Sequence, residues 1–167
     1  MAITSPRPLV GDDNRGAFDC GRASMNNWFV RHAWSNQKND ATRTNVICDS
    51  DNDKLVGYVT LSATHIARSV LAKSQQRNKP DSVPAMLLGQ LAVDIKYQGQ
   101  GHAASLLHFA MKTTLNFSDH VGCYGLITHP LDDEIRKFYQ KHGFKDIPYD
   151  PRQAMIVRMI DLVKSGF

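Results

Sequence analysis

With 167 residues, 42% of them hydrophobic and 22% charged, the chain has the size of one globular domain with a buried core, and we expect a single domain over residues 1–167. Lys and Arg outnumber Asp and Glu by 20 to 16, and the resulting net charge of +4 favours anionic partners such as nucleotides or RNA only mildly. Three widely spaced cysteines without a CxxC pattern argue against a disulfide framework or a structural zinc site, and the lack of any apolar run near ~18 residues argues against a membrane span, so we expect a soluble, cytoplasmic protein.

The N-terminal third predicts one helix followed by a hairpin. Within residues 22–35, hydrophobic side chains recur at the i, i+3, i+4 spacing of an amphipathic helix that lies on a core. Residues 44–48 and 55–61 are rich in β-forming residues, and the polar segment 49–54 separates them. These two runs therefore predict two strands joined by a turn.

The middle of the chain predicts a strand, a glycine turn, a helix and a second strand. A polar and mostly basic connector, residues 68–82, precedes the apolar run 83–93, which we interpret as a buried central strand. Directly after a glycine-rich turn, apolar residues recur at helical spacing over 103–117, and residues 121–128 predict another buried strand. This order is that of a βαβ unit.

The C-terminal part predicts a further helix and the closing strands. The acidic residues 132–134 suit the positive end of a helix, and Gly143 suits its C-terminal end. Phe144 and the run 154–160 supply the last strands. The complete order predicts a mixed α/β fold with one crossover connection.

The glycine turn is the segment that carries the chemistry. Gly99 and Gly101 lie where a strand passes into a helix, so backbone N–H groups can converge on an anion at the positive end of the helix. A Rossmann site requires a third glycine where Ala104 stands, and a Walker A loop requires Gly-Lys-Ser or Gly-Lys-Thr, which the sequence lacks. The turn therefore favours binding of a pyrophosphate in a site that is neither a Rossmann site nor a Walker A loop.

Three segments together resemble the GNAT superfamily of N-acetyltransferases. The turn, Gln98-Gly99-Gln100-Gly101-His102-Ala103, fits the pattern Q/R-x-x-G-x-G/A of that family. Before it stands Leu91-Ala92-Val93-Asp94, and after it stands Phe138-Tyr139-Gln140-Lys141-His142-Gly143-Phe144, which fits F-Y-x-x-x-G-F. The resemblance implies an α/β GNAT fold, in which helices flank a mixed central sheet, with acetyl-CoA as cosubstrate and no metal.

The resemblance also implies which residues bind the cosubstrate. The central strand lends its backbone to the pantetheine arm, and a backbone N–H of that strand is our candidate for holding the oxyanion. The turn and the start of the helix hold the pyrophosphate. The cofactor-binding candidates are Leu91, Ala92, Val93, Gln98, Gly99, Gln100, Gly101, His102, Ala103 and Phe138.

Tyr139 is the candidate catalytic residue. A tyrosine with a pKa near ~10 is protonated at neutral pH, and it can give its proton to a departing thiolate, which Phe cannot do. On the predicted helix its neighbours are Ile135 and Phe138, so we expect its ring to be half buried. The alternative is a tyrosine that only packs on a helix face.

Other segments narrow the resemblance to the GNAT toxins of bacterial toxin–antitoxin pairs. These include Phe18-Asp19-Cys20-Gly21, Val56-Gly57-Tyr58 and Pro84-Ala85-Met86-Leu87-Leu88-Gly89. Such toxins acetylate the α-amine of aminoacyl-tRNA and inhibit translation, and the resemblance implies a ribbon-helix-helix antitoxin as partner and leaves a homodimer open. The chain departs from the family at Gln90, where many members carry Arg.

Basic residues in the N-terminal half are candidates for contacts with tRNA phosphates. The alternative is a solvated basic surface, because no aromatic RNA-binding motif accompanies them. Two other functions also stay open: a metabolic GNAT enzyme that acetylates a small amine or peptide, and a non-catalytic module that binds CoA or RNA. The tRNA-binding candidates are Arg31, Lys38, Arg43, Arg77 and Lys79.

Overall fold

The computed structural model describes residues 2–167, which form two compact units. The first comprises residues 2–62 and 89–110, and the second comprises residues 63–88 and 111–167. Strand β3 (Lys54–Ala67), strand β4 (Ser82–Val93) and helix α3 (His102–Ser118) each contribute residues to both units.

Within residues 2–167, seven strands form a mixed sheet of order β1-β2-β3-β4-β5-β7-β6. The pairs β1–β2, β2–β3, β5–β7 and β6–β7 are antiparallel, whereas β4 and β5 are parallel. A parallel pair requires a crossover, and α3 supplies it. The predicted mixed α/β fold is confirmed. The strands are β1 (Arg7–Pro8), β2 (Arg43–Asp49), β3 (Lys54–Ala67), β4 (Ser82–Val93), β5 (Gly125–Thr128), β6 (Lys145–Asp146) and β7 (Met155–Arg158).

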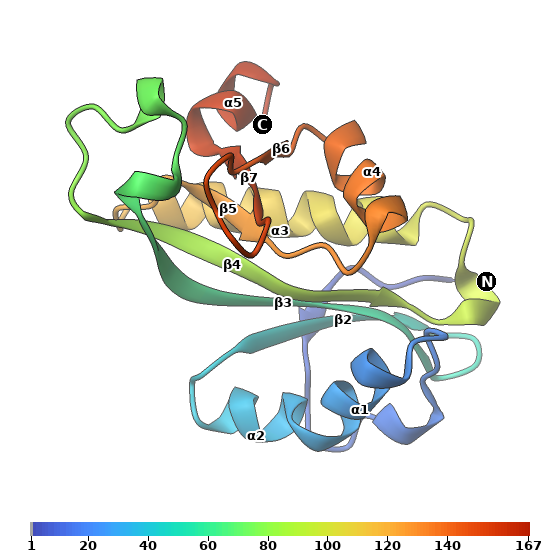
Figure 1. The fold of residues 1–167 in the computed structure, drawn as a ribbon. Helices are drawn as coiled ribbons and strands as arrows, with labels where there is room; N and C mark the ends of the chain where they lie inside the picture. Colours follow the sequence, from blue (N-terminus) through green and yellow to red (C-terminus); the bar gives the residue numbers. More distant parts are fainter. Residues whose placement is uncertain (1) are drawn as a thin grey trace. The chain divides into compact units, whose positions relative to one another are not determined.

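In the first unit, the short helices α1 (Ala23–Arg31) and α2 (Ala33–Lys38) pack beside β2 (Figure 1). Tyr58 is the centre of this core: its ring stacks on Phe29 at 4.1 Å, and its hydroxyl donates to the Met25 carbonyl at 2.9 Å. The prediction of one helix over 22–35 is wrong at His32, whose φ of −122° and ψ of −24° separate the two helices.

In the second unit, α4 (Asp133–Lys141), α5 (Met159–Lys164) and the 3-10 turns η2 (Arg68–Val70) and η3 (Lys73–Gln75) accompany β5, β6 and β7. The predicted closing strand over 154–160 is wrong beyond Arg158, where the chain becomes helical. The Arg158 guanidinium bonds both carboxylate oxygens of Asp161 at 2.8 and 2.9 Å, and this acidic residue in the first turn suits the positive helix end. The strand predicted over 121–128 is confirmed only from Gly125.

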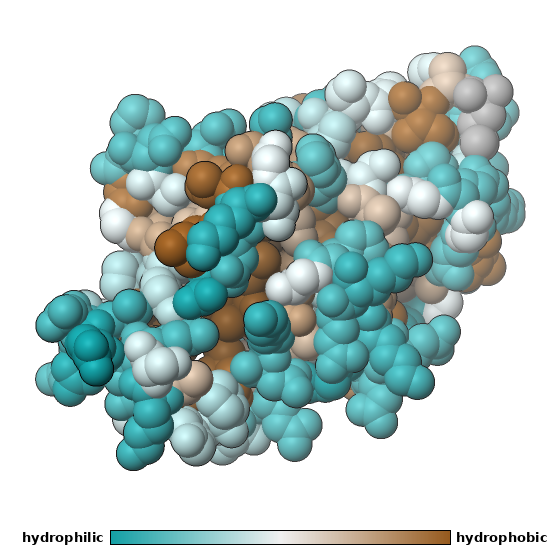
Figure 2. All heavy atoms as spheres, turned by 90° about the horizontal axis from the view of Figure 1, so that it is seen from above, coloured by the Kyte–Doolittle hydropathy of each residue, from teal (hydrophilic) through white to brown (hydrophobic). Residues whose placement is uncertain are grey.

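Figure 2 shows one face of the molecule, on which hydrophobic side chains reach the surface in small groups between hydrophilic ones. Scattered exposed apolar residues of this kind are normal for a protein surface. Within residues 2–167, no helix combines the length and the apolar composition that crossing a membrane requires.

Candidate active site

The glycine turn lies at the amino end of α3, a helix of 17 residues. It follows the 3-10 turn η4 (Ile95–Tyr97) and contains Gly99 at φ +78° and Gly101 at φ +87°. Side chains are strained at such φ values, so the backbone path itself requires glycine. A Cβ atom at either position would meet no atom within 4 Å, so open space adjoins the turn. Backbone N–H groups are thus accessible to an anion at the positive end of a helix.

Gln98 joins this turn to the strand before it. Its side-chain Nε2 donates to the carbonyl oxygen of Val93 at 2.8 Å and to that of Cys20 at 3.1 Å. The amide group is therefore occupied within the protein and positions the turn. This contact gives a physical reason for the residue type at the start of the predicted motif.

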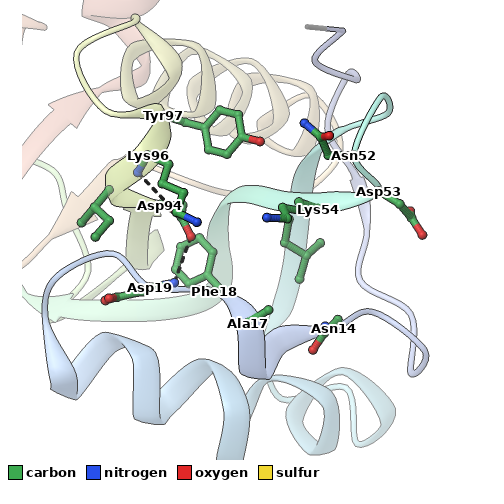
Figure 3. Close-up of a pocket in the computed structure, with 12 residues that line it drawn as sticks. Asn14, Ala17, Phe18, Asp19, Asn52, Asp53, Lys54, Asp94, Lys96 and Tyr97 are labelled. Atoms are coloured by element: carbon green, nitrogen blue, oxygen red, sulfur yellow. Dashed lines mark hydrogen bonds between the residues drawn. The ribbon is translucent and has the colours of Figure 1, made fainter.

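Asp94 fixes the end of β4 in the same way (Figure 3). One carboxylate oxygen accepts from the backbone N–H of Lys96 and the other from that of Asp19, both at 3.0 Å. The backbone N–H of Ile95 donates to the Asp19 carbonyl at 2.9 Å. The segment around Asp19 and the segment that leads into the glycine turn are thus held together by hydrogen bonds on both sides.

These contacts form part of the wall of a cavity of about 400 Å³. Figure 3 shows Tyr97, Asp94, Phe18 and Lys54 around it, drawn from three separate stretches of the chain. The Tyr97 hydroxyl donates to the Asp49 carboxylate at 2.8 Å, a bond that holds the pKa of Asp49 below its usual value and raises that of Tyr97. The polar groups around this cavity therefore brace the strand end that precedes the turn.

Asp94→Asn should weaken cosubstrate binding through the turn. An amide offers one acceptor where the carboxylate offers two, so one backbone N–H loses its partner, at a cost of about 1–3 kcal/mol. We expect the KM for the cosubstrate to rise several-fold and kcat to change little. Steady-state kinetics at varied cosubstrate concentration measure this. Asp53→Asn, at the exposed tip of the neighbouring hairpin, is the matched control; a fall in Tm without a change in KM would contradict the positioning role.

The end of β4 carries the residues expected to bind the pantetheine arm. Leu91 is half-buried, while Ala92 and Val93 are buried. β3 approaches closely here, since a Cβ atom on Gly57 would lie 2.9 Å from the Ala92 carbonyl oxygen. The oxyanion role of the backbone at Leu91 to Val93 stays a prediction.

Tyr139 lies on α4 in the second unit. Its side chain is only 4% exposed, so the prediction of a half-buried ring is wrong. It packs edge-on against Phe138 at 5.3 Å and Phe144 at 5.1 Å. Burial raises the pKa of Tyr139 to about 12, and the hydrogen bond with the Thr128 side chain lowers it by a smaller amount. The phenol is therefore fully protonated at neutral pH, as a proton donor requires.

The sequence from residue 42 to residue 146 matches the acetyltransferase (GNAT) domain. The chain belongs to the GNAT family. A tRNA-acetylating toxin from Mycobacterium tuberculosis is 31% identical to it over 154 residues, which are 92% of each chain. A probable toxin TacT from Sinorhizobium fredii is 25% identical over 152 residues, 86% of this chain and 84% of the relative.

Solved structures of GNAT toxins are similar over nearly the whole chain. AtaT complexed with acetyl-methionyl-tRNAfMet is 27% identical, with a TM-score of 0.91 over 99% of this chain and 100% of that one. AtaTR bound with acetyl-CoA is 28% identical, with a TM-score of 0.86 over 99% and 98% of the two chains. The GNAT fold predicted for this chain is confirmed.

The GNAT turn of this chain fits the pyrophosphate of acetyl-CoA. Besides the open space at Gly99 and Gly101, the Nε2 atom of His102 is buried without a hydrogen-bond partner at the first residue of α3. A buried unpaired nitrogen is costly unless a ligand or water pairs with it. Among the described residues, no group of His, Cys, Asp and Glu side chains is arranged to hold a metal ion.

The predicted site residues fall into two sets. Leu91 to Val93 and the turn, Gln98 to Ala103, lie in the first unit, whereas Phe138 and Tyr139 lie in the second. The sequence analysis did not identify Thr128 as the partner of Tyr139. Thr128 is a buried polar residue at the carboxyl end of a parallel strand, where ligand-binding residues of α/β proteins often lie, and this position could have indicated it.

The basic candidates for tRNA binding are spread over both units. In the first, Arg31 and Lys38 are exposed, and Arg43 pairs with Asp40 at 2.6 Å. In the second, Arg77 is exposed and the Lys79 ammonium lies 4.5 Å from the centre of the Tyr124 ring. Their role in binding tRNA stays a prediction.

Proposed function

We propose that this GNAT protein is a toxin that transfers an acetyl group from acetyl-CoA to the α-amine of aminoacyl-tRNA and so inhibits translation. The similarity to AtaT in its complex with acetyl-methionyl-tRNAfMet, over 99% of the chain, carries the proposal. The 31% identity to a tRNA-acetylating toxin supports it independently. In this proposal residues 1–167 act as one GNAT domain, and a tRNA acceptor places the reaction in the cytoplasm.

The chain's own residues support each step of this chemistry. Acetyl-CoA supplies the acetyl group as an activated thioester. The glycine turn and the amino end of α3 hold its pyrophosphate, and backbone N–H groups at Leu91 to Val93 stabilise negative charge as it develops on the carbonyl oxygen. Tyr139 gives its phenolic proton to the departing sulfur.

The acceptor needs little help from a base. An α-amine has a pKa of about 7.7–8.0, so it is partly neutral at cellular pH, unlike the side chain of Lys. The neutral nitrogen forms a bond to the carbonyl carbon, the carbon–sulfur bond breaks, and the sulfur takes the proton of Tyr139. The nitrogen loses a proton to water, and water returns a proton to the Tyr139 phenolate. This matches a site in which the assigned proton donor is a tyrosine.

The partners follow from the same proposal. Arg31, Lys38, Arg43, Arg77 and Lys79 contact tRNA phosphates, whose charge is neutralised by Lys and Arg in such complexes. One solved structure shows an AtaT mutant bound to the C-terminus of the antitoxin AtaR and acetyl-CoA. By analogy, we propose a cognate antitoxin as the protein partner. The resemblance to the GNAT toxins implies the ribbon-helix-helix type for it and leaves a homodimeric toxin open.

The test is transfer of radiolabel from acetyl-CoA to total charged tRNA. We expect label in an N-acetylated amino acid after mild alkaline release, and none with deacylated tRNA as the matched control. Label on small amines alone would indicate a metabolic acetyltransferase. CoA binding without turnover on any amine would indicate a binding module, and either result would overturn the proposal.

A further inference from the structure

The side chain of Thr60, on β3 in the first unit, holds the backbone of β4. Its hydroxyl accepts the backbone N–H of Gln90 at 2.8 Å, and the residue is only 1% exposed. The two strands come close at this point, because a Cβ atom on Gly89 would lie 3.0 Å from the Thr60 Oγ1 atom. Glycine at position 89 therefore leaves the room in which the hydroxyl reaches the Gln90 N–H.

The N–H groups of Gln90 and Asp94 both point towards β3. The Asp94 N–H donates to the carbonyl oxygen of Val56 on that strand at 2.8 Å. Backbone groups of successive residues in a strand point to alternate sides, and an even number of positions separates Gln90 from Asp94. The N–H groups of Leu91 and Val93 therefore point away from β3.

The N–H groups of Leu91 and Val93 lie on the side of β4 from which the glycine turn is held. The carbonyl oxygen of Val93 points to the same side as its N–H, and it accepts from the Gln98 side chain at 2.8 Å. The parallel pairing of β4 with β5 ends at Leu88, before this segment begins. Among the described residues, no strand is thus paired with β4 on this side at Leu91, and the N–H of Leu91 is available to a ligand.

Thr60 fixes the residue that directly precedes this N–H group. We propose that Thr60 is a positioning residue, whose hydroxyl holds Gln90 so that the Leu91 N–H points at the carbonyl oxygen of acetyl-CoA. The inference rests on the proposed function, in which backbone N–H groups of this segment stabilise the oxyanion, and it adds the side chain that orients them. Because Thr60 is buried, it acts through Gln90 and not by contact with the reactants. A donor held in place stabilises developing charge without reorganisation, so a small displacement is costly.

Thr44 on β2 provides a matched control for Thr60. It lies directly opposite Thr60 in the register of β2 and β3, and it is 0% exposed. Among the described residues, the Oγ1 atom of Thr44 has no hydrogen-bond partner. The two threonines therefore share residue type and burial but differ in the contact on which the inference depends.

Thr60→Val tests the inference, because valine keeps the branched shape of threonine and lacks the hydroxyl. We expect kcat to fall by about 10–10²-fold and the KM for acetyl-CoA to change by no more than about twofold, because the lost positioning acts in the transition state. Backbone hydrogen exchange at Gln90 should become faster, since its N–H loses an acceptor. The kinetic measurement is steady-state acetylation at varied acetyl-CoA concentration, with any amine that the unmodified protein acetylates.

Three further variants separate positioning from packing. Thr60→Ser keeps the hydroxyl and loses a buried methyl group, so its Tm should fall while kcat stays close to the unmodified value. Thr44→Val should leave kcat unchanged and should not lower the Tm, because it removes a buried hydroxyl that has no partner. Gly89→Ala crowds the Thr60 hydroxyl and should lower kcat, so it provides the test if Thr60→Val does not fold.

The possible outcomes distinguish this inference from the proposed function. An unchanged kcat in Thr60→Val, or in Gly89→Ala where that variant replaces it, would overturn the inference. Equal losses of kcat in Thr60→Val and Thr60→Ser, or a rise in KM alone, would overturn it as well, because the hydroxyl would then not act on the chemical step. Acetylation of small amines and not of charged tRNA would overturn the proposed function, and the same variants would still test Thr60. No acetylation of any amine would overturn both.

Discussion

We expect Tyr139→Phe to lower kcat by about 10²–10⁴-fold, the usual contribution of a positioned general acid. The KM for acetyl-CoA should hardly change, because the ring and its packing against Phe138 and Phe144 remain. Loss of one hydrogen bond to Thr128 costs about 0.5–1.5 kcal/mol, so the variant should still fold. Single-turnover acetylation of charged tRNA measures the effect on chemistry directly.

The matched control is Tyr149→Phe, which removes an exposed phenol from the same unit. It should leave kcat unchanged. In cells, inducible expression of the unmodified protein and of Tyr149→Phe should arrest growth, and Tyr139→Phe should not. Retention of the full rate in Tyr139→Phe would show that the buried tyrosine only packs.

The raised pKa of Tyr139 determines how the acetylation rate and the stability of the protein depend on pH. In the proposed mechanism the protonated phenol is the active form. Its pKa of about 12 lies above the ordinary 10.0, so we expect that the loss of this proton does not limit the rate in the physiological range. The rate should instead rise as the α-amine loses its proton near its pKa of about 7.7–8.0. The pKa of Tyr139 is higher in the folded protein than in the unfolded chain, so its neutral phenol contributes to the stability of the folded protein. This contribution is fully present below pH 10.0 and is lost as the pH rises towards about 12.

The order of the elements could be predicted because it depends on local patterns. Strand β4, the turn at Gly99 and Gly101, and α3 follow from an apolar run, two glycines and a 3.6-residue period. α5 was missed because Met159 and Ile160 continue the apolar run of β7, and the first sign of the helix is the pairing of Arg158 with Asp161. Hydrophobicity alone does not distinguish a short strand from a short exposed helix.

The contacts that position the site could not be predicted, because they are distant in sequence. Asp19 and Asp94 are 75 residues apart, yet the Asp94 carboxylate accepts the Asp19 N–H. Both residues stand in segments that resemble the GNAT toxins, but the resemblance does not say that they touch. The contacts of Gln98 could not be predicted either. Its motif suggests that the side chain contacts a ligand, whereas its side-chain amide donates to the carbonyl oxygens of Val93 and Cys20.

Gly101→Val should weaken the binding of acetyl-CoA more than any substitution at the edge of the site. A β-branched residue at a φ of +87° costs about 1–3 kcal/mol or forces the turn into another conformation. Either outcome removes backbone N–H groups from the place proposed for the pyrophosphate. We therefore expect the KM for acetyl-CoA to rise by at least about tenfold, equivalent to about 1.4 kcal/mol of lost binding. Isothermal titration with CoA separates this effect from catalysis.

Two further variants separate the backbone effect from general destabilisation. Gly122→Ala adds a Cβ atom that would lie 3.8 Å from the Pro84 Cγ atom, an ordinary contact, and it should bind CoA normally. Gly101→Asn should recover part of the affinity, because Asn tolerates positive φ better than Val does. Equal affinities of Gly101→Val and the unmodified protein for CoA would show that the turn does not belong to the CoA-binding site. Equal losses in Gly101→Asn and Gly101→Val would instead mean that the open space beside the turn matters more than its backbone path, because both variants place a side chain where the pyrophosphate must approach.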